Sequence, residues 1–213
     1  MIPAFFRPRL LFRNQAAFGL ALTLPLLAFS AAAAETVQRV DPAGARVVIG
    51  GNRQAKLCSD HARLAADGMM SPAFAVETCT EALQVEDLDV YDRAATHNNR
   101  GIVLLDMQNG VARAQADFND AGELLPSLGE SYVNLGASYL REGRFAEAVG
   151  QIEHGIELGV KEPWRAYFNR AVAREHLGQI REAYEDYMKA AELKPDWELP
   201  RTELARFQVV SGR

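Results

Sequence analysis

The stretch Tyr132–Ile152, which reads YVNLGASYLREGRFAEAVGQI, decides the fold. Large apolar side chains recur in it every three or four residues, a spacing that indicates two amphipathic helices. Gly143 lies between them and relieves the backbone where the first helix must stop. Small residues, Gly136 in the first helix and Ala148 in the second, let the two helices approach closely. One such pair cannot bury its apolar side alone, so pairs must stack on one another.

The same pattern recurs before and after this stretch. Asparagines fall 35 residues apart in the three first helices, at Asn99, Asn134 and Asn169. Alanines fall 34 and 35 residues apart in the three second helices, at Ala114, Ala148 and Ala183. Four residues after each alanine comes a large side chain, namely Phe118, Ile152 and Tyr187. An internal period of this length is typical of helical repeat architectures.

These residues resemble the tetratricopeptide-repeat (TPR) family, whose pattern is W-x2-L-G-x2-Y, then A-x3-F, then P in about 34 residues. The resemblance covers roughly Asp92 to Asp196. The stretch Asp92–Gly101, DRAATHNNRG, also resembles exported TPR proteins of alpha-proteobacteria. The resemblance implies an all-α fold, a right-handed superhelical stack of antiparallel helix pairs with a C-terminal capping helix.

The repeat pattern and the flanking composition divide the chain into seven segments. A capping helix is expected because Leu204, Phe207 and Val210 would share one face of a helix over Leu199–Val210. The segments are a signal peptide (1–34), an extended or disordered arm (35–52), a degenerate helix pair (53–91), TPR 1 (92–127), TPR 2 (128–162), TPR 3 (163–196) and the capping helix (197–213).

The first 34 residues have the three parts of a secretory signal peptide. They contain three arginines and no acidic residue, then an apolar run over Ala16–Phe29, then four alanines. We expect cleavage near Ala34 and a periplasmic location. The alternative is an uncleaved membrane anchor, but the apolar run is shorter than the roughly 20 residues that a spanning helix needs.

Removing this leader makes the chain more acidic. The full sequence has 23 basic and 28 acidic residues, and without the three leader arginines the balance is 20 against 28, a net charge of −8. This balance argues against nucleic acid as the main partner. We also expect no stable membrane insertion of the mature chain.

Two cysteines, Cys58 and Cys79, are predicted to face each other across the degenerate helix pair. Cys58 lies on a stripe of small apolar residues, and Cys79 lies where the large side chain of a second helix normally stands. In an exported protein this arrangement favours a disulfide. The alternatives are two buried free thiols, a redox-active pair, or a metal site that adds His61; the last lacks a fourth ligand.

The asparagine column is the candidate binding site. The family resemblance implies that first helices line a concave face and that asparagine amides there hydrogen-bond an extended peptide backbone. The residues that we predict to bind peptide are Asn98, Asn99, Asn134, Arg141, Arg165, Phe168 and Asn169. Other residues, Glu130 and His176 among them, should face the same way. The alternative is that the asparagines only tie each helix to the adjacent loop.

Catalytic patterns are not recognisable. The sequence has no G-x-S-x-G, H-E-x-x-H or phosphate-loop motif, and its histidines are spread over different predicted helices, at His61, His97, His154 and His176. We therefore predict a non-catalytic protein-interaction module without catalytic residues, cofactor or metal, which binds an extended peptide or partner protein of unknown identity. Two alternatives remain: a structural subunit of an envelope complex that uses its convex face or N-terminal arm, and an enzyme with chemistry that the sequence does not reveal.

Overall fold

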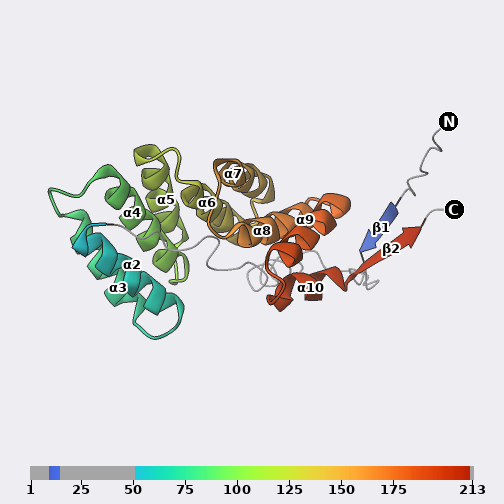
Figure 1. The fold of residues 1–213 in the computed structure, drawn as a ribbon, viewed down its shortest axis with the longest axis horizontal. Helices are drawn as coiled ribbons and strands as arrows, with labels where there is room; N and C mark the ends of the chain where they lie inside the picture. Colours follow the sequence, from blue (N-terminus) through green and yellow to red (C-terminus); the bar gives the residue numbers. More distant parts are fainter. Residues whose placement is uncertain (1–9, 15–50, 212–213) are drawn as a thin grey trace, which may run out of the picture.

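The computed structural model describes residues 10–14 and 51–211. This part of the chain forms nine helices and a two-stranded ribbon (Figure 1). The helices are α2 (Arg53–Ala66), α3 (Pro72–Leu83), α4 (Val90–Leu105), α5 (Val111–Leu124), α6 (Gly129–Arg141), α7 (Phe145–Leu158), α8 (Pro163–His176), α9 (Ile180–Leu193) and α10 (Glu198–Leu204). The strands are β1 (Leu10–Asn14) and β2 (Phe207–Ser211). The predicted leader outside β1 and the predicted arm up to residue 50 lie outside the described residues.

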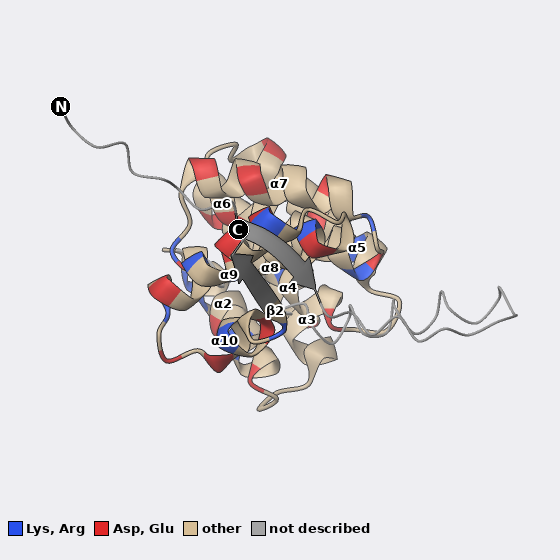
Figure 2. Cartoon of the chain, turned by 90° about the vertical axis from the view of Figure 1, so that its right-hand side faces the viewer, with Lys and Arg blue, Asp and Glu red and all other residues tan. Residues whose placement is uncertain are grey.

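The helices follow one another along the longest axis of the molecule, from α2–α3 at one end to α10 at the other (Figure 1). Each helix packs on the next one in the sequence. The first helices α2, α4, α6 and α8 also contact one another in order, so they form one continuous face of the stack. Viewed from the end, the outer helix α7 carries several acidic positions (Figure 2). The predicted all-α repeat stack is confirmed.

Local sequence explains where the helices begin and turn. The Asn52 side chain accepts a hydrogen bond from the Gln54 amide and caps α2, and Asp89 caps α4 in the same way. Each repeat turns through one residue with a positive φ, namely Asn109 (58°), Gly143 (72°) and Gly178 (74°). Repeat one has a longer turn, because α4 ends at Leu105 and α5 begins only at Val111.

The two helices of a repeat touch where the sequence places a small residue opposite a large one. A Cβ atom on Gly101 would lie 2.6 Å from the Phe118 ring, and one on Gly136 would lie 2.5 Å from Ile152. Both large side chains are fully buried. Glycine at these positions therefore sets how closely the helices pack.

Arginine–aspartate pairs join the two helices in repeats one and three. The Arg100 guanidinium donates to both carboxylate oxygens of Asp117, at 2.9 and 2.7 Å, and Arg170 donates to both oxygens of Asp186 at the same distances. Burial by itself raises the pKa of the Asp117 carboxyl, but hydrogen bonds from Arg100 and His97 and their charges outweigh it and hold this pKa below its usual range. The hydrogen bond with Asp117 likewise raises the pKa of Arg100.

Cys58 in α2 and Cys79 in α3 form a disulfide, as predicted. Both residues are fully buried and pack against Ala82. The bond rules out free thiols and thiolate metal ligands at this place. His61, the third ligand of the alternative metal site, instead shares a 2.9 Å hydrogen bond with Thr78.

Helix α2 is joined to the repeats by a buried carboxylate. The Asp92 side chain, in the first turn of α4, accepts hydrogen bonds from the backbone amides of Gly51 and Asn52, each at 2.6 Å. These bonds hold the start of α2 against α4.

The C-terminal segment differs from the expected helix over Leu199–Val210. Helix α10 ends at Leu204, and β2 follows as a strand paired antiparallel with β1, with Phe207 opposite Asn14 and Ser211 opposite Leu10. Adjacent β-branched residues, Val209 and Val210, favour a strand over a helix here. Phe207 still packs on the core as expected, against the rings of Tyr184 and Tyr187.

Loss of the disulfide is expected to destabilise the chain. Replacing both Cys58 and Cys79 with alanine should lower the free energy of unfolding by about 3 kcal/mol, because the bond restricts the unfolded chain. Urea denaturation of the oxidised protein and of the double variant measures this difference. Equal midpoints and slopes would contradict the expectation.

The Asp117 pair is expected to contribute stability that depends on pH. Asp117→Asn should lower the free energy of unfolding by about 2–4 kcal/mol at pH 7, because it removes a charge from a largely buried pair. Since the folded pKa of Asp117 is depressed, its contribution is present above the unfolded pKa of about 3.9 and is lost as pH falls through the folded pKa.

Denaturation of the native chain and Asp117→Asn from pH 7 down to pH 2 tests this pH dependence. The difference in free energy of unfolding between the native chain and Asp117→Asn should become smaller below about pH 4. Glu123→Gln is the control, because Glu123 is exposed on the same helix, α5, and forms no ion pair within the described residues. A gap that stays constant over this range would argue against the ion pair.

Candidate peptide-binding face

The three asparagines of the column belong to α4, α6 and α8, whose continuous face we call the ladder face. All three are buried, as is Asn98 beside them. The Asn134 amide nitrogen donates to the Asn98 side-chain oxygen at 2.8 Å, which links α4 to α6. This hydrogen bond shows that at least one member of the column ties one repeat to the next.

Asn98 has a donor that the fold leaves unused. Its side-chain nitrogen is buried and has no hydrogen-bond partner in the part of the chain that the structure describes. An unpaired buried amide N–H costs free energy that a ligand carbonyl would recover. The ladder face therefore holds an unused amide donor, which lies below its surface in this structure.

The two predicted arginines are already engaged, to different degrees. Arg141 donates to the Leu105 carbonyl and to the Asp106 carboxylate, both at 2.5 Å, and its side chain is 15% exposed. It therefore satisfies acceptor groups at the C-terminal end of α4. Arg165 donates to Glu162 at 2.9 Å and is 30% exposed, which leaves it the more accessible cation.

Phe168 belongs to the core in this structure. It is fully buried, with its ring centroid 4.9 Å from that of Trp197 and 5.4 Å from that of Tyr187. The structure thus joins Asn98 to Asn134 but directs Phe168 toward the C-terminal cap.

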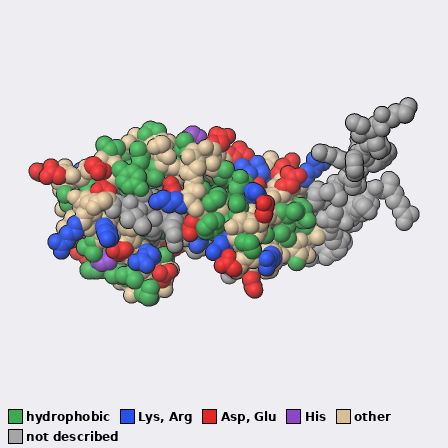
Figure 3. All heavy atoms as spheres, in the orientation of Figure 1, with side chains coloured by type: hydrophobic (Ala, Val, Ile, Leu, Met, Phe, Trp, Pro, Cys, Tyr) green, Lys and Arg blue, Asp and Glu red, His purple; other side chains and the backbone are tan. Residues whose placement is uncertain are grey.

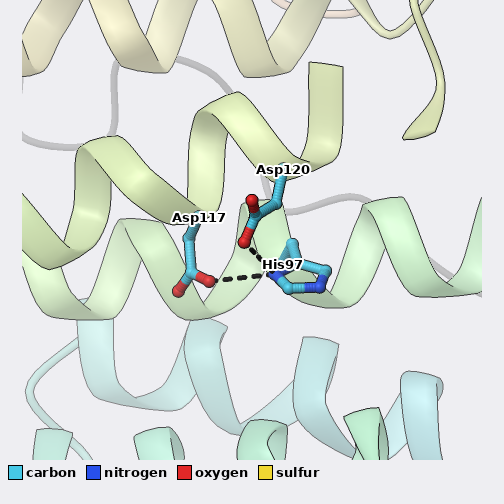
Figure 4. Close-up of side chains that lie close together, drawn as sticks. All are labelled: His97, Asp117 and Asp120. Carbon is cyan, nitrogen blue, oxygen red and sulfur yellow. Dashed lines mark hydrogen bonds and ion pairs between the residues drawn. The ribbon is translucent and has the colours of Figure 1, made fainter. Parts of the chain in front are cut away.

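One group among the described residues has several potential metal ligands close together. His97, Asp117 and Asp120 each offer an atom, and these atoms lie within 4.8 Å of one another (Figure 4). His97 Nδ1 is 2.9 Å from Asp117 and 3.5 Å from Asp120. However, both oxygens of Asp117 already accept hydrogen bonds from Arg100, whose positive charge would oppose a cation. We interpret the group as a network that ties α4 to α5.

The visible surface mixes its side-chain types. Acidic, basic and apolar side chains are interspersed on the face drawn in Figure 3.

No helix in the described ranges is long and apolar enough to cross a bilayer.

Comparisons with known proteins agree with the repeat pattern. A family profile described as "Tetratricopeptide repeat" matches residues 164–197. Hsp70-Hsp90 organizing protein 2 of Arabidopsis thaliana is 29% identical over 108 residues, which are 51% of this chain and 19% of that protein. The chain therefore spans about a fifth of that relative's length.

Two solved structures illustrate the shared fold. MamA 41-end from Desulfovibrio magneticus RS-1 aligns with a TM-score of 0.56 at 22% identity, over 73% of this chain and 84% of that one. The first TPR of Spaghetti (RPAP3), bound to the HSP90 peptide SRMEEVD, aligns with a TM-score of 0.52 at 23% identity, over 57% and 94%. The recurring helix pairs and the small-against-large contacts within them, together with these comparisons, show that the chain has the stacked helix-pair fold of tetratricopeptide-repeat proteins and that residues 164–197 match the repeat itself.

Proposed function

We propose that this chain is a non-catalytic interaction module that binds an extended segment of a partner protein along the ladder face. The observation that carries the proposal is the set of buried asparagines on neighbouring first helices, among which the Asn98 amide nitrogen has no partner within the described residues. Donors and acceptors spaced along stacked helices suit a peptide backbone and read little of its sequence.

Similar proteins support a peptide as the ligand. The RPAP3 structure named above holds an HSP90 peptide, and the second TPR domain of human RPAP3 was solved with the HSP70 peptide SGPTIEEVD. Both peptides end in Glu-Val-Asp. In this chain Arg141 is bonded to the end of α4, so we do not extend the proposal to those acidic C-termini.

The proposed location is outside the cytoplasm. The basic start, short apolar run and alanine-rich end of residues 1–34 support export and cleavage near Ala34. A disulfide is also consistent with an oxidising compartment.

Partner capture tests the role of the ladder face. Chemical cross-linking and pull-down from the source envelope, with residues 35–213 as bait, should capture a partner that Asn98→Ala and Asn134→Ala lose. We expect an affinity loss of about tenfold, equivalent to about 1.4 kcal/mol, for either change. Circular dichroism establishes first that each variant folds.

Asn119→Ala is the matched control, because Asn119 is an exposed asparagine on α5, away from the column. It should capture the partner as well as the native chain does. Equal capture by all variants would mean that the asparagines are structural and would move the search to the opposite face.

Export has its own test. The protein isolated from the envelope should begin near Glu35, because small residues precede that position as a cleavage site requires. N-terminal sequencing measures this directly. A protein that retains Met1–Ala34 after extraction with the membrane fraction would instead identify an uncleaved anchor.

A further inference from the structure

A pocket of about 470 Å³ opens beside the first turn of α6, where the repeats connect to one another. Its volume falls in the range of small-ligand sites. The residues on which the argument depends are Tyr91, Leu125, Leu128, Glu130, Val160 and Lys161. They come from the start of α4, the α5–α6 connection, α6 and the α7–α8 connection.

Glu130 is the one acidic side chain among the residues that line this pocket. It is 7% exposed, and its Oε1 atom accepts a 3.3 Å hydrogen bond from the Lys161 backbone amide. No Lys, Arg or His side chain within the described ranges forms an ion pair with it. A carboxylate removed from water without a counter-charge is costly, although the N-terminal end of α6 favours negative charge there.

The walls of the pocket are suited to an aliphatic chain. Leu128 is buried, Leu125 and Val160 are half-buried, and the Tyr91 ring stands exposed at the side. Lys161 lines the pocket too, but its ammonium group is not paired with Glu130. A pocket lined by apolar side chains and by a carboxylate without an ionic partner among the described residues is complementary to a lysine or arginine side chain, which has a methylene stem and a cationic tip.

We propose that this pocket binds a cationic group on an aliphatic stem, which is the basic side chain of the partner peptide, with Glu130 as its counter-charge. The inference rests on the proposed function for its partner. Glu130 and Asn134 are four residues apart in α6 and so lie on the same face of the helix. A peptide backbone held at Asn134 therefore brings its side chains within reach of the pocket. The site selects partners with a basic residue at that place.

Small cations test the pocket without a known partner. In two-dimensional ¹H–¹⁵N NMR of the full chain, n-butylammonium should produce saturable shifts at the amides of Gly129, Glu130 and Lys161. The neutral probe n-butanol, which has the same stem, should shift them much less. n-Butylguanidinium, compared with n-butylammonium, reports whether the pocket prefers an arginine or a lysine tip.

Three variants show whether Glu130 is responsible. Glu130→Gln keeps the shape and removes the charge, so it should weaken n-butylammonium binding by about tenfold or more. Glu130→Asp keeps the charge on a shorter side chain and should bind with intermediate affinity. Glu123→Gln is the matched control, because Glu123 is exposed on α5, and it should bind as the native chain does.

The outcomes separate this inference from the proposed function. Equal shifts with n-butylammonium and n-butanol, or undiminished n-butylammonium binding by Glu130→Gln, would overturn the proposal that the pocket binds a cationic group. Capture of a partner that depends on Asn134 would then still support the ladder face. Conversely, charge-dependent binding of n-butylammonium together with no captured partner would support the pocket and count against the proposed function.

Discussion

The structure depends on how closely the two helices of each repeat approach. At Gly101 and Gly136 there is no room for even one more carbon atom, because Phe118 and Ile152 occupy that space. In repeat three the corresponding residues are Ala171 and Tyr187, which are both fully buried in the same core cluster. Close packing at these points fixes the angle at which each pair presents its first helix. The ladder face is a consequence of that geometry, repeated three times.

Because the first helices stand side by side, a residue in one repeat can meet the neighbour of its counterpart in the preceding repeat, and Asn134 meets Asn98, which precedes its counterpart Asn99. The hydrogen bond from Asn134 to Asn98 results from this arrangement. It gives the column a structural role without excluding a binding role, since Asn98 keeps an unused donor. Arg141 has only a structural role in this arrangement: we expected it to contact a ligand, but it donates a hydrogen bond to the C-terminal end of the neighbouring first helix, α4. Fewer polar groups of the ladder face are therefore available to a ligand than its polar residues would suggest.

An arginine–aspartate pair stands between the two helices in repeats one and three, but uncharged residues stand there in repeat two. Repeats one and three place Arg100–Asp117 and Arg170–Asp186 between their helices, whereas repeat two has Leu135 and Gln151 at the corresponding positions. The arginines also reach back to the preceding second helix, Arg100 to Thr80 and Arg170 to Glu153. Such pairs need specific geometry, so they help to specify which helix packs against which. Glu130 differs from these carboxylates in that it lines a pocket and has no cationic partner among the described residues.

The sequence by itself determined the repeat period, the helix pairs and the facing cysteines, because these follow from local spacing. Positions three or four residues apart share a helix face whatever the tertiary structure, and glycine at a turn acts through its own backbone. It also indicated that the asparagines share a face. Only the tertiary structure decided which side chains on that face are already bonded, since the partners of Arg141 and Asn134 lie 35 or 36 residues away in another repeat. It likewise ended α10 at Leu204 and paired β2 with β1, which lies almost 200 residues earlier in the segment that the proposed cleavage would remove. Contacts between residues far apart in the chain carry no local signal, and for that reason the pocket at Glu130 emerged from the fold and not from the spacing of its residues.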